Sequence, residues 1–545
     1  MNPAQLLEHF DRISEAPDAV ARLRRFILDL AVCGKLLEHS ANWYEITLGE
    51  IGEWGSGGTP SKSHTEYYGG DIPWLVIGDL NEGLITCAET YITEIGLKNS
   101  SAKMVEPGTV LIAMYGSIGK LGIAGIRCAT NQAIAFCVPD LAKVSREFLV
   151  VVLKSLREEL LEKGHGVAQQ NISQKILKAH PVKLPPLAEQ HRIVAKVDEL
   201  MALCDQLEAA NNEREARRDR LVAASLHRIG TAPAAADEAA TEAQRATPLR
   251  DAARFHLDHL PRLTTRPEHI KQLRQTILNL AVRGRLVPQD PSDEPAGELL
   301  ARKACLPSGY KRRRKILKEI SVDAPVSLFP AIPLTWKYAD IQSLYDLNVI
   351  IDYADGNHGA LYPRSNEFGD DGVTFVTAKD LIDGRVIWKS CAKLNEERAN
   401  QLPKGWAQGG DVLLTHNATV GRVARIEANV GRFLLGTSVT FYRLNRTVLE
   451  SDFFYYLLKS SMWQGQLEAI MAQTTRNQVS IQKQAFFRVV VPPLAEQHRI
   501  VAKVDELMAL CDQLEAQLST SQTDSRRLLE AVLHEALAPA LEKAA

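Results

Sequence analysis

The chain has 545 residues, of which 45% are hydrophobic and 24% are charged, and its formal net charge is −2. Such a length exceeds what one hydrophobic core supports, so several domains are expected, and the near-neutral charge argues against a protein that coats nucleic acid through a general positive field. No apolar run approaches the roughly 20 residues that span a bilayer, and the N-terminus lacks a signal-peptide core, so we expect a cytoplasmic protein.

Residues 1–42 are predicted to be a helical segment, with apolar residues spaced for one face and Gly34 as its stop. The string LRRFILDLAVCGKLL at 23–37 returns in the same register as LRQTILNLAVRGRLV at 273–287. A duplicated unit therefore begins near the N-terminus, and again near residue 251.

Residues 43–184 form a first block of short apolar runs broken by glycine and turn residues, which is typical of β-rich structure. The best strands are expected within 72–80 (IPWLVIGDL) and 108–126. The polar, glycine-rich stretch 56–70 is predicted to be a loop, and 148–164 a helix.

A perfect repeat follows this block. The string PPLAEQHRIVAKVDELMALCDQLEA at 185–209 recurs letter for letter at 492–516, which is 25 identical residues. Its prolines suit the first turn of a helix, and the glutamate after them favours the positive N-terminal end. We therefore expect a central helix over 185–230 and a C-terminal helix over 492–545.

Both copies carry an apolar seam with steps of four and three residues, the spacing of a helix that packs on another helix. The seam residues are Ile193, Val197, Leu200, Cys204, Leu207, Ile500, Val504, Leu507, Cys511 and Leu514. Because both copies offer the same seam, each is expected to be the partner of the other, in an antiparallel pair about a pseudo-two-fold axis.

Between the repeats, residues 231–250 are predicted to be an alanine-rich linker and 251–290 a second conserved helix. Residues 291–333 are expected to be another linker, whose basic run KRRRK at 311–315 is either a solvated face or a phosphate contact. Residues 334–491 form a second β-rich block that resembles the first in outline.

The two blocks align in their strands but not in their loops. VTFVTAKDLIDG at 373–384 matches the strand region IPWLVIGDLNEG, whereas GNHGALYPRSN at 356–366 has no counterpart in SKSHTEYYGG at 61–70. Identical helices with divergent loops indicate that the helices meet the same partner twice and that the loops read different targets. The predicted fold class is α+β, with two β-rich domains joined and separated by long antiparallel helices.

No catalytic motif accompanies this architecture. GSIGK at 116–120 is too short for a phosphate-binding loop, GSGG at 55–58 is no dinucleotide loop, and no Asn-Pro-Pro-Tyr-type methyltransferase motif occurs. Asn357-His358-Gly359 is more typical of a turn or a base contact than of a nuclease. The eight cysteines show no Cys-x-x-Cys spacing, which argues against a zinc site or a disulfide framework.

This order of elements resembles the specificity subunit of Type I restriction–modification systems over nearly the whole chain. The resemblance is carried by the two PPLAEQ helix entries, the two ILxLAVxGxL helices, and SGGTPSK with IPWLVIGDL in the first block. In the second block DGNHG, YPRSN and GDVLL with VGR carry it. The resemblance implies a non-catalytic DNA-binding subunit whose two blocks are target-recognition domains, each reading half of a split sequence.

The same resemblance implies partners and cofactors. The conserved helices would space the recognition domains and bind two methyltransferase subunits, which use S-adenosylmethionine, while restriction (motor-nuclease) subunits that use ATP and Mg²⁺ complete the complex. The chain itself is expected to bind no cofactor and no metal. It is expected to bind double-stranded DNA that carries a bipartite site, and no membrane.

The candidate DNA-binding residues are polar side chains of the paired loops, because Arg and Lys suit guanine and Asn and Gln suit adenine in the major groove. In the first block they are Lys62, Ser63, His64, Tyr67, Tyr115, Ser117, Lys120, Gln170 and Asn171. In the second block they are Asn357, His358, Arg364, Lys379, His416, Asn417, Thr419, Arg422, Arg476, Asn477 and Gln478.

Two other classes remain open at the level of sequence. One is a coiled-coil scaffold whose β-rich domains bind proteins or glycans, and copurification with a methyltransferase and retention of duplex DNA would argue against it. The other is a self-sufficient methyltransferase or nuclease, which would show cofactor-dependent activity without a partner.

We predict that the isolated chain binds DNA weakly. Lys and Arg number 13 against 15 Asp and Glu in residues 43–184, and 17 against 16 in residues 334–491, so neither block supplies a strong nonspecific field. Titration of duplex DNA at two salt concentrations checks this. Tight binding with a steep salt dependence would contradict it.

Overall fold

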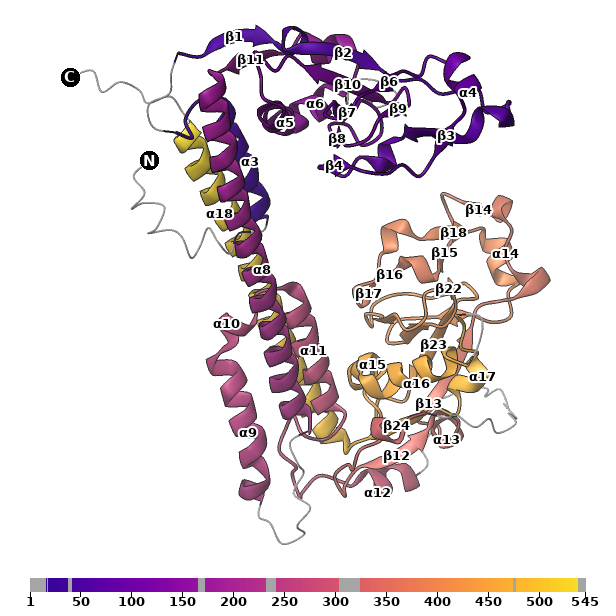
Figure 1. Ribbon diagram of the computed structural model, residues 1–545. Helices are drawn as coiled ribbons and strands as arrows, with labels where there is room; N and C mark the ends of the chain where they lie inside the picture. The colour runs from indigo at the N-terminus through magenta and orange to yellow at the C-terminus, as the bar shows by residue number, and fades with distance from the viewer. Residues whose placement is uncertain are drawn as a thin grey trace. The chain divides into compact units, whose positions relative to one another are not determined.

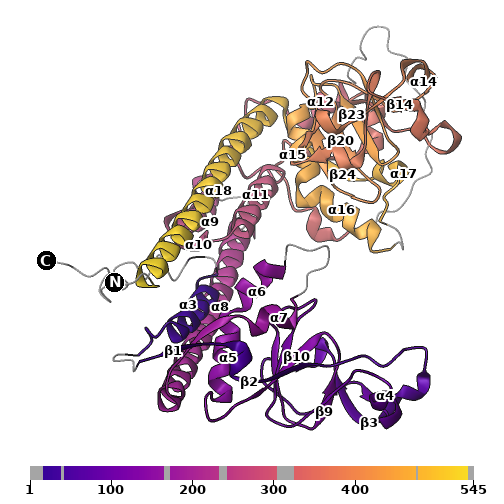
Figure 2. The ribbon, with the colours of Figure 1, turned by 90° about the horizontal axis from the view of Figure 1, so that it is seen from above.

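The structure is a computed structural model that describes residues 16, 18–37, 42–164, 172–231, 242–302, 324–473 and 477–537. The chain divides into two compact units, Met1–Ala216 with Thr520–Ala545, and Arg217–Ser519. The division falls inside the two long helices labelled in Figures 1 and 2, α8 (Leu187–Thr231) and α18 (Leu494–Leu537). Each unit thus holds the start of one long helix and the end of the other, the grouping that an antiparallel pair produces.

The first unit contains α3 (Ala19–Val32) and the first β-rich domain, which begins with β1 (Tyr44–Thr47) and ends with β11 (Pro181–Leu184). These two strands pair antiparallel and bring the ends of the domain together. Its other strands form a five-stranded sheet of order β2-β10-β7-β8-β4 and a four-stranded sheet of order β5-β3-β9-β6. Their bounds are β2 (Gly52–Ser56), β3 (Tyr68–Leu75), β4 (Leu84–Ile85), β5 (Tyr91–Ile92), β6 (Met104–Val105), β7 (Val110–Ala113), β8 (Leu121–Ala124), β9 (Cys128–Thr130) and β10 (Ile134–Pro139). The helices of the domain are α4 (Glu94–Lys98), α5 (Arg146–Ser155), α6 (Arg157–Gly164) and α7 (Gln174–Lys178).

The second unit repeats this plan. β12 (Lys337–Asp340) and β24 (Arg488–Val491) pair antiparallel at the ends of the second β-rich domain. Between them lie a four-stranded sheet of order β13-β23-β20-β21, a five-stranded sheet of order β14-β18-β15-β22-β19 and the β16-β17 hairpin. The strands are β13 (Ile350–Asp355), β14 (Phe368–Gly369), β15 (Val373–Val376), β16 (Leu381–Ile382), β17 (Arg385–Val386), β18 (Ala392–Leu394), β19 (Trp406–Ala407), β20 (Val412–Thr415), β21 (Val423–Arg425), β22 (Phe433–Leu435) and β23 (Val439–Leu444). The helices are α9 (Glu242–Asp258), α10 (Leu260–Leu263), α11 (Pro267–Ala281), α12 (Ala296–Ala301), α13 (Ile341–Asp346), α14 (Glu396–Asn400), α15 (Ser451–Lys459), α16 (Ser461–Met471) and α17 (Ile481–Gln484).

The predicted α+β class with two β-rich domains and long helices is confirmed. Two local predictions are wrong. The segment 251–290 is not one helix. α10 begins at Leu260 with Pro261 in its first turn, and α11 begins at Pro267, so two breaks separate these helices from α9 and from each other. Within the predicted linker 231–250, helix α9 already begins at Glu242, and residues 232–241 lie outside the described part of the chain.

The PPLAEQ entry of each long helix is fastened to its domain by a buried glutamine. The side-chain oxygen of Gln190 accepts from the Ser145 amide (2.7 Å), and its amide group donates to the carbonyls of Lys143 and Pro185 (both 2.8 Å). Gln497 makes the equivalent three bonds at 2.8–3.0 Å with Glu450, Val448 and Pro492. A fully buried amide whose groups are all paired fixes the helix start rigidly.

The glutamate of the same motif receives a tryptophan from the start of the domain. Trp43 Nε1 donates to Glu189 Oε1 (3.2 Å), and Trp336 Nε1 donates to Glu496 Oε2 (2.8 Å). Both ends of each domain are therefore held at the first turn of its long helix.

The seam residues do not form the expected core between the two copies. In the first copy Ile193, Val197 and Cys204 are buried in a cluster with residues of α3 and α5, such as Ile27 and Phe148. Leu200 packs against the same cluster, and Leu207 is half-buried.

The second copy behaves in the same way within its own unit. Ile500, Val504 and Cys511 are buried in a cluster that includes Ile277 of α11, and Leu507 and Leu514 pack against it. The seam-to-seam prediction is wrong because α3 and α11, the LRRFILDLAV and LRQTILNLAV helices, offer an apolar face within the same unit and cover the seams themselves.

Matching ion pairs fix each of these short helices on its long one. Arg24 of α3 lies 2.7 Å from both Asp205 and Glu208 of α8. Arg274 of α11 lies 2.6 Å from Asp512 and 3.0 Å from Glu515 of α18. The same contact is thus made twice, from the same positions of both repeats.

The residues just after each short helix contact the tail of the other long helix. In the first unit Lys35 donates to the carbonyl of Leu537 (2.5 Å) at the end of α18. In the second unit Arg285 donates to the carbonyl of Gly230 (3.2 Å) near the end of α8. Each unit is therefore completed by a helix tail from the opposite half of the chain.

We predict that Gln190→Ala destabilises the first unit. The change strands three buried backbone groups, at about 1–3 kcal/mol each before relaxation, so the free energy of unfolding should fall by about 2–5 kcal/mol. Denaturant unfolding of the full chain measures this. The exposed Gln206 of the same helix provides the control, since Gln206→Ala should change stability by less than about 0.5 kcal/mol. Equal stability of the two variants would refute the clamp.

Candidate nucleic-acid interface

The sheet topology brings the predicted loops together in pairs. β2 and β7 both pair antiparallel with β10, so they run in the same direction, and the loops 57–67 and 114–120 leave the sheet at one edge. In the second domain β13 and β20 both pair antiparallel with β23, so the loops 356–366 and 416–422 also leave at one edge. Each domain thus presents one composite loop edge.

In the first domain, the loop after β2 exposes most of its predicted residues. Lys62, Ser63 and His64 are exposed and Tyr67 is half-buried. The His64 ring stacks on Tyr67 with 4.8 Å between the ring centroids, and its Nδ1 lies 2.8 Å from Glu66 Oε1. These contacts hold the loop while leaving polar groups available to a ligand.

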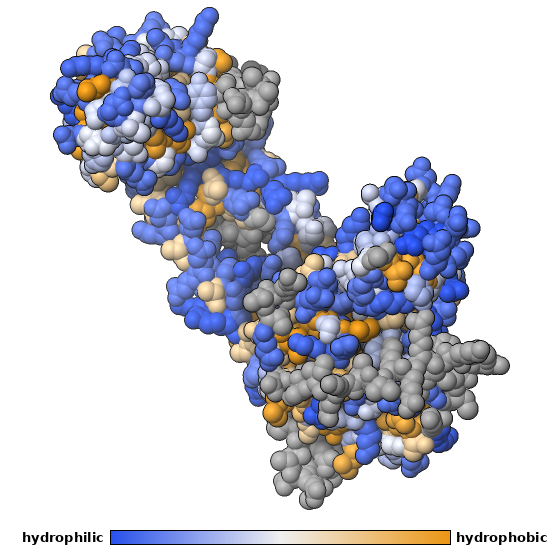
Figure 3. Space-filling model, turned by 90° about the vertical axis from the view of Figure 1, so that its right-hand side faces the viewer, coloured by the Kyte–Doolittle hydropathy of each residue, from blue (hydrophilic) through white to orange (hydrophobic). Residues whose placement is uncertain are grey.

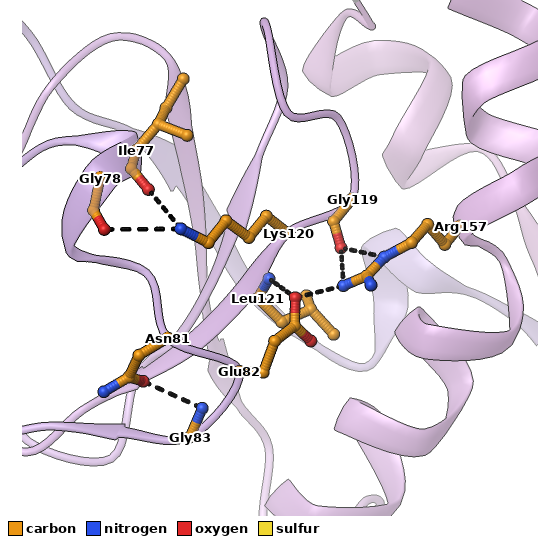
Figure 4. A network of polar contacts seen from close by, with 9 residues as sticks. All are labelled: Ile77, Gly78, Asn81, Glu82, Gly83, Gly119, Lys120, Leu121 and Arg157. Carbon is orange, nitrogen blue, oxygen red and sulfur yellow. Dashed lines mark hydrogen bonds and ion pairs between the residues drawn. The ribbon is translucent and has the colours of Figure 1, made fainter. Parts of the chain in front are cut away.

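The loop after β7 differs from the prediction at one residue. Tyr115 and Ser117 are exposed, as a reading role requires. Lys120 is half-buried, and its Nζ donates to the carbonyls of Ile77 (3.3 Å) and Gly78 (3.4 Å), as Figure 4 shows. The lysine ties the 115–120 loop to the turn after β3, so its ammonium group is engaged within the protein.

Arg157, at the start of α6, is a residue that the loop-based prediction missed. Its Nε and Nη2 donate to the carbonyl of Gly119 (3.0 and 2.8 Å), and it pairs with Glu82, which accepts from the Leu121 amide (3.2 Å; Figure 4). A bidentate guanidinium fixes geometry better than a point charge does. The arginine therefore holds the loop rather than adding to its exposed face.

The second domain holds its 416–422 loop through an equivalent pair of side-chain contacts, which we call the loop clamp. Arg422 donates to the carbonyl of Leu381 (3.2 Å), and Gln464 donates to the carbonyl of Gly421 (3.0 Å), where the first domain uses Lys120 and Arg157. Gly119 and Gly421 both have a positive φ, 78° and 94°, which a glycine adopts without strain. Glycine followed by a basic residue in both blocks was the sequence signal for this clamp.

Two predicted reading residues of the second domain are buried. His416 is 2% exposed, and its Nδ1 hydrogen-bonds with the Thr440 hydroxyl (2.9 Å). Burial lowers the pKa of this imidazole. Asn357 is also 2% exposed, and its Nδ2 donates to the carbonyl of Lys404 (2.7 Å). Both residues are buried beneath the loop edge because each closely follows a core strand, Asn357 after β13 and His416 after β20.

The other predicted residues of this domain lie at or near the surface. His358, Arg364, Lys379, Thr419 and Arg422 are exposed, and Asn417 is half-buried and bridged to Gln478. Asn477 and Gln478 are exposed. Gln170, Asn171 and Arg476 lie outside the described residues.

A second surface is shared by the two long helices. Within the identical string, several side chains outside the glutamine contacts and the seams are exposed in both copies. Leu203 is 51% exposed and its equivalent Leu510 is 47% exposed. The other exposed pairs are Ala195 and Ala502, Glu199 and Glu506, Ala202 and Ala509, and Gln206 and Gln513.

The face seen in Figure 3 is mostly hydrophilic with separate hydrophobic patches. Among the residues that the structure describes, no group of three or more His, Cys, Asp or Glu side chains is placed to hold a metal ion. Within the same ranges, no helix combines the length and apolarity needed to cross a membrane.

Comparison with known proteins places both domains in one family. A family model described as the Type I restriction modification DNA specificity domain matches residues 40–215 and 354–521. The Type I restriction enzyme EcoAI specificity subunit of Escherichia coli is 25% identical over 407 residues, which cover 72% of this chain and 65% of that protein. The EcoEI specificity subunit of Escherichia coli is 25% identical over 419 residues, 73% of this chain and 66% of that protein. The match thus spans slightly less than two thirds of either relative.

A solved structure of a specificity subunit is also similar to this chain. The HsdS subunit from Thermoanaerobacter tengcongensis aligns over 92% of this chain and 98% of its own, with 17% identity and a TM-score of 0.38.

Proposed function

Since this chain belongs to the Type I restriction modification DNA specificity family, we propose that it is the subunit that reads the DNA sequence of such a complex. The observation that carries the proposal is the paired architecture. Two domains with the same strand plan present composite loop edges whose sequences differ, and each is fixed to an identical helix entry. Each domain would then read one half of a bipartite target.

The loop edges supply what base reading requires. Side chains that read bases must be held in place before DNA binds. An untethered loop would lose conformational entropy when it becomes ordered on the DNA, and this loss would weaken binding. The clamps by Lys120, Arg157, Arg422 and Gln464 hold the loop backbone, and leave Tyr115, Ser117 and Thr419 exposed. Phosphate contacts would position the duplex, and these side chains would specify the bases.

The matching outward faces of α8 and α18 support a partner bound twice. Fold stability accounts for the identity of the clamps and seams, but not for identical exposed residues such as Leu203 and Leu510. We assign these faces to two copies of a methyltransferase subunit, which would bring S-adenosylmethionine. Restriction subunits that use ATP and Mg²⁺ would join through that assembly, and this chain would contribute recognition without catalysis.

The first test of this function is a domain exchange. In cells that carry the chain with its methyltransferase partner, methylated adenines should map to two short blocks divided by a fixed gap. Replacing the loops of the second domain, 356–366 and 416–422, by those of a relative should change one block only, because the loops of the first domain are in a separate unit. Simultaneous change of both blocks, or methylation without a bipartite pattern, would refute the proposal.

The second test addresses the repeated helix face. Leu203→Arg and Leu510→Arg each place a charge on one face, so each single variant should bind one methyltransferase subunit instead of two, and the double variant none. Native mass spectrometry of the complex gives the stoichiometry. Leu221, exposed on α8 beyond the identical string, is the control, and Leu221→Arg should keep both subunits. Two bound subunits in all variants would exclude this face.

A further inference from the structure

A buried carboxylate marks the end of β13 in the second domain. Asp355 is 8% exposed. Its Oδ1 accepts from Lys404 Nζ and its Oδ2 accepts from His358 Nε2, both at 2.7 Å. Both oxygens are therefore engaged, and the carboxylate joins a lysine from one loop to the histidine of the predicted reading loop.

The backbone around this carboxylate has little freedom. Asn357 Nδ2 donates to the carbonyl of Lys404 (2.7 Å), so Lys404 is bound through both its side chain and its main chain. A Cβ on Gly356 would lie 2.2 Å from the carbonyl oxygen of Leu435, so only glycine fits there. The loop that carries His358 is consequently held by three contacts: the carboxylate of Asp355, the bond from Asn357 to Lys404, and the close packing of Gly356.

The carboxylate decides which nitrogen of His358 carries the proton. Burial would raise the pKa of Asp355, but the hydrogen bonds and charges of Lys404 and His358 lower it below its ordinary value. An ionised carboxylate only accepts hydrogen bonds, so Nε2 of His358 must be the donor. With that proton on Nε2, Nδ1 is the ring nitrogen left to accept a hydrogen bond, on a side chain that is 51% exposed at the composite loop edge.

The described strand ends of the first domain do not carry these residues. Ser56 ends β2 and the buried Met114 follows β7, where the second domain has Asp355 at the end of β13 and the buried His416 after β20. His416 is turned inward to the Thr440 hydroxyl and does not compete for the carboxylate. The charged network is thus a property of the second domain, which is where a difference in target would be encoded.

We propose that Asp355 and Lys404 are positioning residues that fix His358 as a hydrogen-bond acceptor for an exocyclic amino group in the major groove. Adenine N6 and cytosine N4 are the amino groups exposed there, whereas guanine and thymine present carbonyl oxygens. His358 therefore specifies one adenine or cytosine in the half-site of the second domain. This inference rests on the proposed function and names the chemistry of one contact within it.

Asp355→Asn provides the sharpest test, because it keeps the shape and removes the constraint on the tautomer. An amide can accept from Nε2 or donate to it, so the ring can also adopt the form with a proton on Nδ1, which donates to a carbonyl oxygen. The variant should therefore relax one position from adenine or cytosine toward guanine and thymine, with the preference falling about tenfold. His358→Ala should abolish discrimination at the same position.

The readout is a methylation map of cells that carry the partner methyltransferase with the wild-type chain, Asp355→Asn, His358→Ala or the control Asp383→Asn. Asp383 is an exposed carboxylate elsewhere in the same domain, and its change should leave the map as in the wild type. Melting of each purified variant separates unfolding from altered reading. Relaxation confined to one base of one half-site supports the inference.

Two outcomes overturn it differently. A wild-type map that is bipartite, with unchanged base preference in folded His358→Ala and Asp355→Asn, would refute the role of His358 and leave the proposed function standing. A wild-type map without bipartite methylation would refute the proposed function itself, and the inference with it.

Discussion

The buried side chains of Gln190 and Gln497 are the contacts on which the arrangement of each unit depends. Each amide joins three segments: the first turn of the long helix, the strand that leads into it, and the turn before α5 or α15. Because a buried amide is costly when any of its groups is unpaired, only one geometry of helix and domain satisfies it. The neighbouring glutamate and tryptophan add the other end of the domain to the same point. The direction in which each loop edge faces relative to its own helix start is thereby fixed.

The contacts of these glutamines help to explain why the repeat is identical in both copies. Gln190 and Glu189 serve the domain, and Ile193 and Val197 serve α3 or, in the second copy, their equivalents serve α11. Leu203 serves neither, so a different cause must account for the leucine that stands at this position in both copies. Binding of a common partner is the simplest cause. The structure thus separates the residues that build the unit from those that face outward, although all of them lie in one unbroken string.

Sequence patterns predicted the elements better than their partners. Repeats and periodicity located the long helices and the β-rich blocks, because burial imposes a regular spacing of apolar residues. The seam at Ile193 and Ile500 revealed an apolar face but not what covers it, and α3 and α11 covered it instead of the opposite copy. Polar letters in loops predicted exposure for His64 and Arg364 but failed for His416 and Asn357, since only the fold shows that these follow core strands. Arg157 escaped prediction because it lies on a helix, and Asp355 because its role depends on two residues from separate loops.

The exchange of helix tails also bears on the order in which the chain can fold during synthesis. Leu529 and Val532 of α18 are buried against Ala16 and Ala19. This cluster cannot form until the residues beyond 520 have left the ribosome. All of the second unit, Arg217–Ser519, is made in the interval. Contacts between residues more than 500 positions apart close slowly, because the entropy of so large a loop is lost before they form. Until then the side of α3 around Ala19 stays uncovered. The first unit is therefore completed only in a molecule whose second unit has already been synthesised.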